Sequence, residues 1–237
     1  MEIKINKKPK NPKIIEGFPG FGLIGTITTE FLLEHLDVEK IGSFKYEELP
    51  ATVAIHKGKL VDPMGIFYNK KHNLVIFHTI LNSTGLEWKL SEAITNMAEH
   101  LDAKEIISLE GVSSPRVKED YSEDIYFYAK DEKKKKELKK LNIKPLEESI
   151  IVGVSAALML NSKTPQVCFF AETKTELPDS KAAANMVKLL DKYLGLEVDY
   201  KPLLKKAEEF EKKFKNIMKQ SSITAKERDK KKMSYLG

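Results

Sequence analysis

A glycine-rich turn near the N-terminus is the first candidate for ligand chemistry in this sequence. Gly20, Gly22 and Gly25 match the pattern G-x-G-x-x-G, between an apolar stretch typical of a strand and an amphipathic stretch typical of a helix. In that context glycine lets a backbone approach a phosphate, and the amides at the start of the helix favour negative charge. A nucleotide-binding protein or enzyme that uses the turn at 17–25 is therefore one hypothesis.

The residues around this turn favour a steric role for its glycines. Phe18, Pro19 and Phe21 are bulky and apolar, which suits packing better than a phosphate cradle. Glu47 stands about where a ribose-binding acid is expected, but it follows the predicted strand. No lysine follows the glycines, so a P-loop is excluded. We therefore prefer a tight strand-to-helix crossover in which side chains would not fit.

Ser155 is a candidate nucleophile because Gly153 and Ser155 begin a pattern that resembles a nucleophile elbow, with alanine in place of the last glycine. In hydrolases with this motif the catalytic histidine follows the serine in the chain. All the histidines precede Ser155, so that order is impossible here: His35, His56, His72, His78 and His100. We expect Ser155 to be a helix N-cap instead.

The remaining reactive side chains indicate no catalytic residue, metal or cofactor. The histidines show no H-E-x-x-H spacing. Cys168 lies among apolar residues, which is typical of a small core side chain. A single cysteine allows no internal disulfide and is expected in a reducing compartment. Glu87 and Trp88 begin a predicted helix, where we expect them to pack rather than line a cleft.

Composition and charge narrow the function classes further. The chain has 237 residues, 41% hydrophobic and 32% charged, which is typical of a globular protein. No apolar run of about 18 residues predicts a membrane span, and the N-terminal residues lack the apolar region of a secretory signal, so we expect a cytoplasmic protein. The net charge is +5, but residues 201–237 alone carry +7. Nucleic-acid binding by the nearly neutral body therefore has no support, and nucleic-acid binding through residues 201–237 is a third and weaker hypothesis.

The alternation of strand and helix patterns predicts an α/β sandwich with a mixed sheet covered on both faces. The predicted strands are 13–16, 41–46, 51–55, 60–61, 65–68, 74–80, 105–109, 125–128, 150–154 and 166–170. The predicted helices are 23–36, 88–101, 131–141, 156–160, 180–194 and 202–219. We expect an α/β domain over residues 1–200, a C-terminal helix over 201–220 and a basic flexible tail over 221–237.

The end of the chain is a candidate for partner binding. Lys226–Lys232 forms a basic segment, and Met233, Tyr235, Leu236 and Gly237 follow it. An apolar and aromatic end with a free carboxylate is typical of a peptide that anchors in a partner's groove. The lysines would steer it electrostatically toward an acidic surface.

Several segments together resemble the archaeal members of the proteasome assembly chaperone family. They are Glu16–Gly25, Glu48–Ala51, Glu110–Val112, Gly153–Leu158, and the stretches Asp179–Ala183 and Leu194–Asp199. The resemblance spans about residues 13–215. It implies a three-layer α/β/α domain similar to purine nucleoside phosphorylase, without that enzyme's activity.

The resemblance also implies self-association into a homo-oligomer and binding to the α subunits of the proteasome core particle. In several such chaperones a hydrophobic residue, a tyrosine and any last residue dock between α subunits. Here Tyr235 is third from the end, one residue or about 3.3 Å further from the carboxylate. Some relatives carry an ATP-grasp label, but this sequence shows no acidic magnesium cluster or phosphate-gripping lysine.

Overall fold

The computed structural model describes residues 2–45, 53–56, 58–61, 63–113, 124–173, 177–205 and 216. Within these residues, one nine-stranded sheet has the order β1-β3-β6-β7-β2-β8-β11-β9-β10. Its strands are β1 (Glu2–Ile5), β2 (Lys13–Gly17), β3 (Val38–Lys45), β6 (Met64–Asn69), β7 (Leu74–Thr79), β8 (Glu105–Ser113), β9 (Ile125–Ala129), β10 (Lys144–Pro145) and β11 (Gln166–Thr173). A separate hairpin pairs β4 (Ala54–His56) with β5 (Lys59–Val61).

The sheet is mixed, as the sequence predicts. Strands β7, β2, β8 and β11 run parallel at its centre, while β1, β3 and β6 extend one side through antiparallel pairs. On the other side β9 pairs antiparallel with β11, and β10 joins it in parallel. The carboxyl ends of the four central strands therefore lie along one edge of the sheet, which is where α/β folds commonly place functional side chains.

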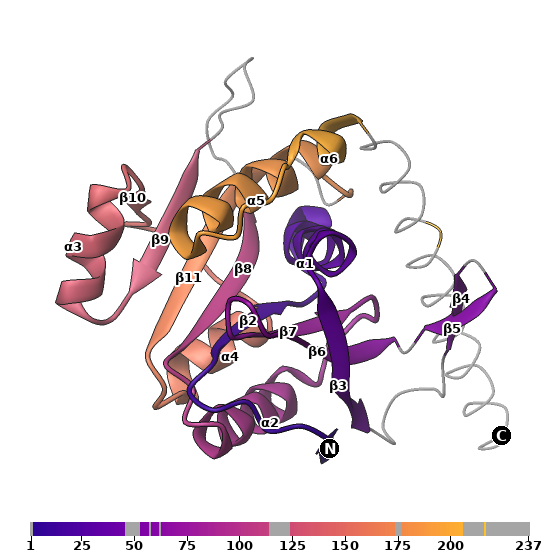
Figure 1. Cartoon of the computed structure of the whole chain (residues 1–237). Coiled ribbons are helices and arrows are strands. Elements are labelled where there is room, and N and C mark those ends of the chain that lie inside the picture. The colour runs from indigo at the N-terminus through magenta and orange to yellow at the C-terminus, as the bar shows by residue number, and fades with distance from the viewer. Residues whose placement is uncertain are drawn as a thin grey trace, which may run out of the picture.

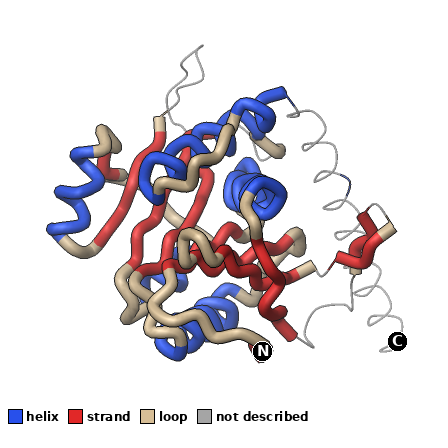
Figure 2. The backbone as a smooth tube through the Cα atoms, viewed as in Figure 1, coloured by secondary structure: helices blue, strands red, loops and turns tan. Residues whose placement is uncertain are grey.

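Helices cover both faces of the sheet (Figures 1 and 2). They are α1 (Ile24–His35), α2 (Glu87–His100), α3 (Glu132–Lys140), α4 (Val154–Asn161), α5 (Ser180–Leu194) and α6 (Lys201–Lys205), with a short 3₁₀ turn, η1 (Phe21–Leu23), before α1. Helices α1 and α5 pack together on one face and α2 and α4 on the other, while α3 lies beside β9 and β10. This arrangement confirms the predicted three-layer sandwich.

Two hydrophobic clusters fill the space between the sheet and its helices. Successive strand residues point to opposite faces, so the neighbours Ile14 and Ile15 enter different clusters. Ile15 joins α1 and α5, and Ile14 joins α2 and α4. This burial on both faces explains why the central strands are nearly continuous apolar runs.

Local signals in the sequence set several helix ends. The Asp131 and Asp179 side chains cap α3 and α5 by accepting hydrogen bonds from the amides of Lys134 and Ala182. Gly195 ends α5 in the left-handed conformation, with φ of 66°, directly after the predicted helix end at residue 194. No helix in the described ranges is long and apolar enough to cross a membrane.

The predicted strand at 150–154 is wrong. Residues 150–153 pair with no strand in the described sheet, and α4 begins at Val154. Ile150 and Val152 are exposed, whereas Ile151 packs against a small cluster around Cys168 and Phe170. These residues form a continuous apolar run, which is typical of a buried strand, but they pair with no strand among the described residues. The short strand β10 was missed because two residues give no periodic signal.

The predicted C-terminal helix falls partly outside the described residues. Helix α6 begins at Lys201, one residue before Pro202, and Leu203 is buried in the core cluster that contains α5. The first turn of this helix therefore packs on the α/β domain rather than starting a separate unit. The predicted tail at 221–237 lies outside the described residues.

Candidate functional site

The glycine-rich turn joins β2 to α1 through very close backbone packing. A Cβ atom added to Gly25 would lie 2.5 Å from the Leu109 carbonyl oxygen and 2.8 Å from the Gly17 Cα atom. Gly22 has φ of 67°, a conformation that favours glycine. These contacts support the steric interpretation of the glycines, because the protein's own backbone fills the space that side chains would need.

Gly20 closes the turn over a carboxyl group. A Cβ atom at this position would lie 2.6 Å from Glu110 Oε2. A phosphate beside Gly20 would therefore meet a glutamate side chain instead of the lysine or arginine that phosphate sites use. This contact weighs against the nucleotide-binding hypothesis for Gly20, Gly22 and Gly25, and Glu47 lies outside the described residues.

Two buried glutamates meet one serine at the carboxyl edge of the sheet. Glu16 in β2 is 0% exposed and Glu110 in the neighbouring strand β8 is 7% exposed. Ser155, also buried, comes from the first turn of α4, and its Oγ atom lies 2.7 Å from Glu16 Oε1 and 2.6 Å from Glu110 Oε1. One hydroxyl thus joins two central strands to a helix on the α2–α4 face.

Proton counting constrains the charge of this cluster. A serine hydroxyl carries one proton, so Ser155 donates to only one of the two carboxyl groups. The other contact is a hydrogen bond only if that carboxyl group is protonated and donates to Ser155 Oγ. The geometry therefore requires at least one carboxyl proton shared among the two carboxyl groups and the serine, so the cluster carries at most one negative charge.

The electrostatic surroundings agree with a shared proton. Burial, and after it the negative charge of Glu16, raises the pKa of Glu110 to about 8. Burial also raises the pKa of Glu16, and hydrogen bonds with the Ser108 and Ser155 hydroxyls oppose that rise. The remaining negative charge lies at the N-terminus of α4, where the helix dipole stabilises an anion. The cluster is therefore an anchor for α4 that depends on its protonation.

Ser155 is not the helix N-cap that the sequence predicts. Gly153, with φ of 107° and no side chain, occupies the cap position, and Ser155 lies inside α4. The prediction was wrong because a serine at a helix start usually accepts a hydrogen bond from an amide of its own helix. Ser155 instead contacts the carboxyl groups of Glu16 in β2 and Glu110 in β8. Glu16 and Glu110 match no catalytic or metal-binding motif and belong only to the family motifs Glu16–Gly25 and Glu110–Val112. The available signal was a glutamate beside buried apolar residues in each of two strands, since glutamate is rarely buried unless it has a partner.

The structure also places the other candidate residues. Cys168 is buried as predicted, and burial raises the pKa of its thiol. His78 is buried, with Nδ1 2.9 Å from Thr29 Oγ1 and Nε2 2.9 Å from Glu30 Oε2. In the part of the chain that the structure describes, no group of three or more histidine, cysteine, aspartate or glutamate side chains is arranged to hold a metal.

Glu87 and Trp88 at the start of α2 differ in their contacts and exposure. Glu87 Oε1 accepts a hydrogen bond from the Gly85 amide and so fixes the turn before the helix. Trp88 is 57% exposed, so the expectation that it packs is wrong. The predicted anchors Met233, Tyr235, Leu236 and Gly237, and the lysines before them, lie outside the described residues.

Comparison with known proteins gives the family. The sequence pattern of the PAC2 family matches residues 14–218, and the chain belongs to this family. An uncharacterized protein of Methanocaldococcus jannaschii is 27% identical over 214 residues, which cover 89% of this chain and 87% of that protein. The family predicted from the sequence is thereby confirmed.

Solved structures show the same fold. The chain is similar to Pyrococcus furiosus PbaA, described as an archaeal homolog of proteasome-assembly chaperone, with a TM-score of 0.84 and 28% identity over 94% of this chain and 100% of PbaA. It also shares its fold with P. furiosus PbaB, described as an archaeal proteasome activator. That comparison gives a TM-score of 0.71 and 21% identity over 91% of this chain and 98% of PbaB.

Replacing the bridging serine tests the anchor. Ser155→Ala should lower the free energy of unfolding by about 1–3 kcal/mol, because it leaves buried carboxyl oxygens without a partner. Ser91→Ala in α2 is the matched control, since the Ser91 hydroxyl is equally buried but has no hydrogen-bond partner among the described residues. Urea unfolding of both variants measures the difference. Equal effects of the two substitutions would show that the bridge contributes nothing.

The shared proton predicts an unusual pH dependence. The unfolded chain loses the Glu110 proton near the ordinary pKa of 4.5, whereas the folded protein keeps it until about 8. The unfolded state therefore binds fewer protons in this window, and stability should fall there by up to about 1.4 kcal/mol per pH unit.

Glu110→Gln should flatten that slope, because the amide stays neutral and can donate to Ser155. The exposed Glu148→Gln is the control and should keep the slope of the unsubstituted protein. Unfolding free energies measured between pH 5 and 8 test this. A slope that Glu110→Gln leaves unchanged would contradict the shared proton.

Proposed function

We propose that this protein is a non-catalytic binding protein of the proteasome-assembly-chaperone type, which self-associates and binds α subunits of the proteasome core particle in the cytoplasm. Membership of the PAC2 family and similarity to PbaA over nearly the whole chain support this role. The buried carboxyl cluster supports a structural rather than a catalytic part for its members, because Ser155 engages both glutamates and the protein covers them.

The observation that carries the proposal is a set of large apolar side chains left in solvent on the α2–α4 side. Ile150 is 90%, Val152 77% and Leu160 72% exposed, and Trp88 on α2 is 57% exposed. We call these four residues the α2–α4 apolar set. Large apolar side chains left in solvent on neighbouring elements are candidates for a surface that binds another protein, and α2 and α4 pack side by side. An aromatic residue among them is typical of a binding hot spot.

The carboxyl cluster supports this use of the surface. Residues 150–153 lead directly into α4, and the Ser155 bridge fixes the first turn of that helix to β2 and β8. Ile150 and Val152 are therefore presented from a fixed point, although no sheet strand pairs with them within the described residues. A surface that is already positioned loses less conformational entropy when a partner binds.

The C-terminal residues form a second part of the proposal. Tyr235 and Leu236 would act as anchors with Met233, the Gly237 carboxylate as an ion-pair acceptor, and Lys226–Lys232 as an electrostatic tether. These residues and the α2–α4 apolar set would act together. Two linked contacts raise the overall affinity because the second forms at a high effective concentration.

Substitutions in the α2–α4 apolar set test the proposal. The double variant Ile150→Ser/Val152→Ser should weaken binding to archaeal α subunits, or self-association, by at least about tenfold. Its stability should stay within about 0.5 kcal/mol, because both side chains are already in solvent. Val53→Ser/Ile55→Ser is the matched control, since it also alters two exposed alternate residues, next to or within β4.

Analytical ultracentrifugation and surface plasmon resonance with purified α subunits measure these effects. If both double variants bind and self-associate like the unsubstituted protein, the α2–α4 apolar set is not the contact surface.

Removal of the chain end tests its anchors separately. Deletion of residues 233–237, or Tyr235→Ala alone, should weaken α-subunit binding while self-association stays unchanged. Ser234→Ala is the matched control because it leaves the anchors and the carboxylate in place. High salt should weaken the remaining contribution of Lys226–Lys232. Co-purification that the deletion leaves unchanged would remove the chain end from the mechanism.

A further inference from the structure

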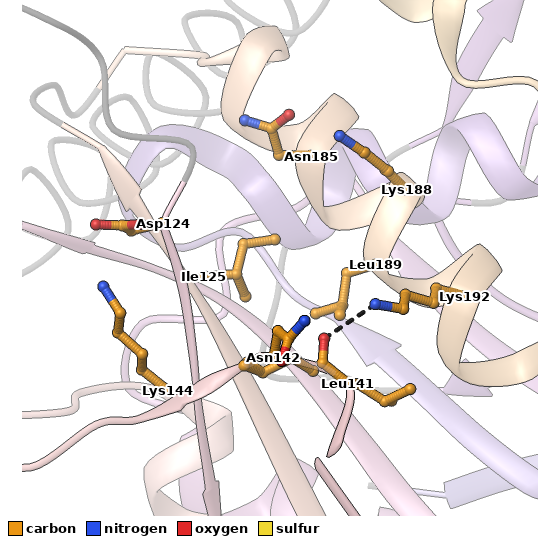
Figure 3. A pocket seen from close by; sticks show the side chains of 10 residues that line it. Asp124, Ile125, Leu141, Asn142, Lys144, Asn185, Lys188, Leu189 and Lys192 are labelled. Atoms are coloured by element: carbon orange, nitrogen blue, oxygen red, sulfur yellow. Dashed lines mark hydrogen bonds between the residues drawn. The ribbon is translucent and has the colours of Figure 1, made fainter. Parts of the chain in front are cut away.

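A pocket that the proposed function does not use lies between β9, β10 and α5 (Figure 3). It has a volume of about 240 Å³. Its lining residues are Asp124, Ile125, Leu141, Asn142, Ile143, Lys144, Asn185, Lys188, Leu189 and Lys192. They come from two strands, a turn and a helix, and the fold brings residues 124–144 together with residues 185–192 of α5.

The pocket combines an apolar floor with a basic rim. Its apolar lining consists of Ile125, Leu141, Ile143 and Leu189, all buried or half-buried. Three lysines on the rim are exposed, and among the lining residues only Asp124 is acidic. The lining therefore carries a formal charge of +2, which suits a ligand that joins an apolar group to negative charge.

The charge around the pocket strengthens this preference. Residues 130–144, which include α3 and the first residue of β10, contain eight lysines and three acidic residues. Lys134 forms an ion pair with Glu137, and Lys135 forms one with Glu132. With these acidic residues counted, the segment has a net charge of +5. A surface of one sign raises the local concentration of oppositely charged partners and speeds their association.

The rim lysines have different roles. Lys192 donates a hydrogen bond from Nζ to the Leu141 carbonyl oxygen at 3.0 Å, which holds the turn against α5. Lys144 and Lys188 form no ion pair with any residue that the structure describes, and the Lys188 ammonium lies 5.8 Å from the centre of the Tyr200 ring. Lys144 and Lys188 are therefore the side chains that can pair with an incoming carboxylate.

We propose that this pocket binds an acidic peptide segment of a partner protein. One apolar side chain of the segment rests on the floor, and the carboxylates beside it pair with Lys144 and Lys188. A peptide suits the site better than a small metabolite, because the pocket is smaller than about 300 Å³ and its basic rim is exposed. A peptide gains further contacts along the basic surface outside the pocket.

A nucleic acid suits the pocket less well. Such sites commonly stack bases on aromatic side chains and use arginine on phosphates, and the lining residues include neither.

The pocket also lies apart from the α2–α4 apolar set. Ile125 packs into the cluster with α1 and α5, whereas its neighbour Tyr126 packs with Ile151 on the other face of the sheet. The peptide site is thus separate from the surface proposed for α subunits.

Fluorescence anisotropy with a labelled peptide Glu-Asp-Leu-Asp-Glu tests the proposal on the purified full chain. The peptide should bind saturably, and the double variant Lys144→Glu/Lys188→Glu should weaken its affinity by at least about tenfold. Lys104→Glu/Lys163→Glu is the matched control, because it reverses two exposed lysines elsewhere and changes the net charge equally. The control should change the affinity less than about twofold. Circular dichroism confirms that both variants fold.

Two further peptides separate the parts of the site at constant ionic strength. Gln-Asn-Leu-Asn-Gln lacks the charges and Glu-Asp-Ser-Asp-Glu lacks the apolar side chain, and each should bind at least about tenfold more weakly. The proposal is overturned if the acidic peptide does not saturate, if either altered peptide binds equally well, or if both double variants weaken binding alike. It is also overturned if single-stranded RNA binds more tightly with the same dependence on Lys144 and Lys188. None of these outcomes depends on proteasome binding.

Discussion

The hydroxyl of Ser155 is the point at which the two central strands and the α2–α4 face are joined. It lies within hydrogen-bond distance of both Glu16 and Glu110, so one carboxyl proton must be shared for both contacts to be favourable. Burying two ionised carboxylates beside each other would be strongly unfavourable, whereas a shared proton leaves one charge at a helix N-terminus. The position of α4 therefore depends on the ionisation of this pair.

That anchor connects the core to the surface. The glycine turn places Gly20 against Glu110, and Gly153, the cap residue before α4, lies on the other side of the same carboxyl group. A Cβ atom added to Gly153 would lie 3.9 Å from Glu110 Oε1. Ile150 and Val152 precede that glycine by a few residues and stand in solvent. Three of the family motifs, Glu16–Gly25, Glu110–Val112 and Gly153–Leu158, thus meet around one cluster in space. Their shared task, in our interpretation, is to present a binding surface rather than to process a substrate.

Much of the fold could be predicted from local patterns, and the candidate site could not. The hairpin around Gly58 and the end of α5 at Gly195 follow from turn and cap chemistry that involves neighbouring residues. The Ser155 cluster joins residues 45 and 139 positions apart, and no periodicity encodes such a pairing. For residues 150–153, by contrast, a local pattern predicted a strand that the structure does not contain. These consecutive apolar residues are typical of a buried strand, but no neighbouring strand pairs with them within the described residues.

Amide hydrogen exchange of the full chain, with and without purified archaeal α subunits, tests the central claim most directly. If the protein works by binding through the α2–α4 side, exchange in peptides covering 148–160 should slow in the complex, while peptides from α5 should exchange as before. Exchange that stays the same throughout 148–160 at saturating α subunits would contradict the account.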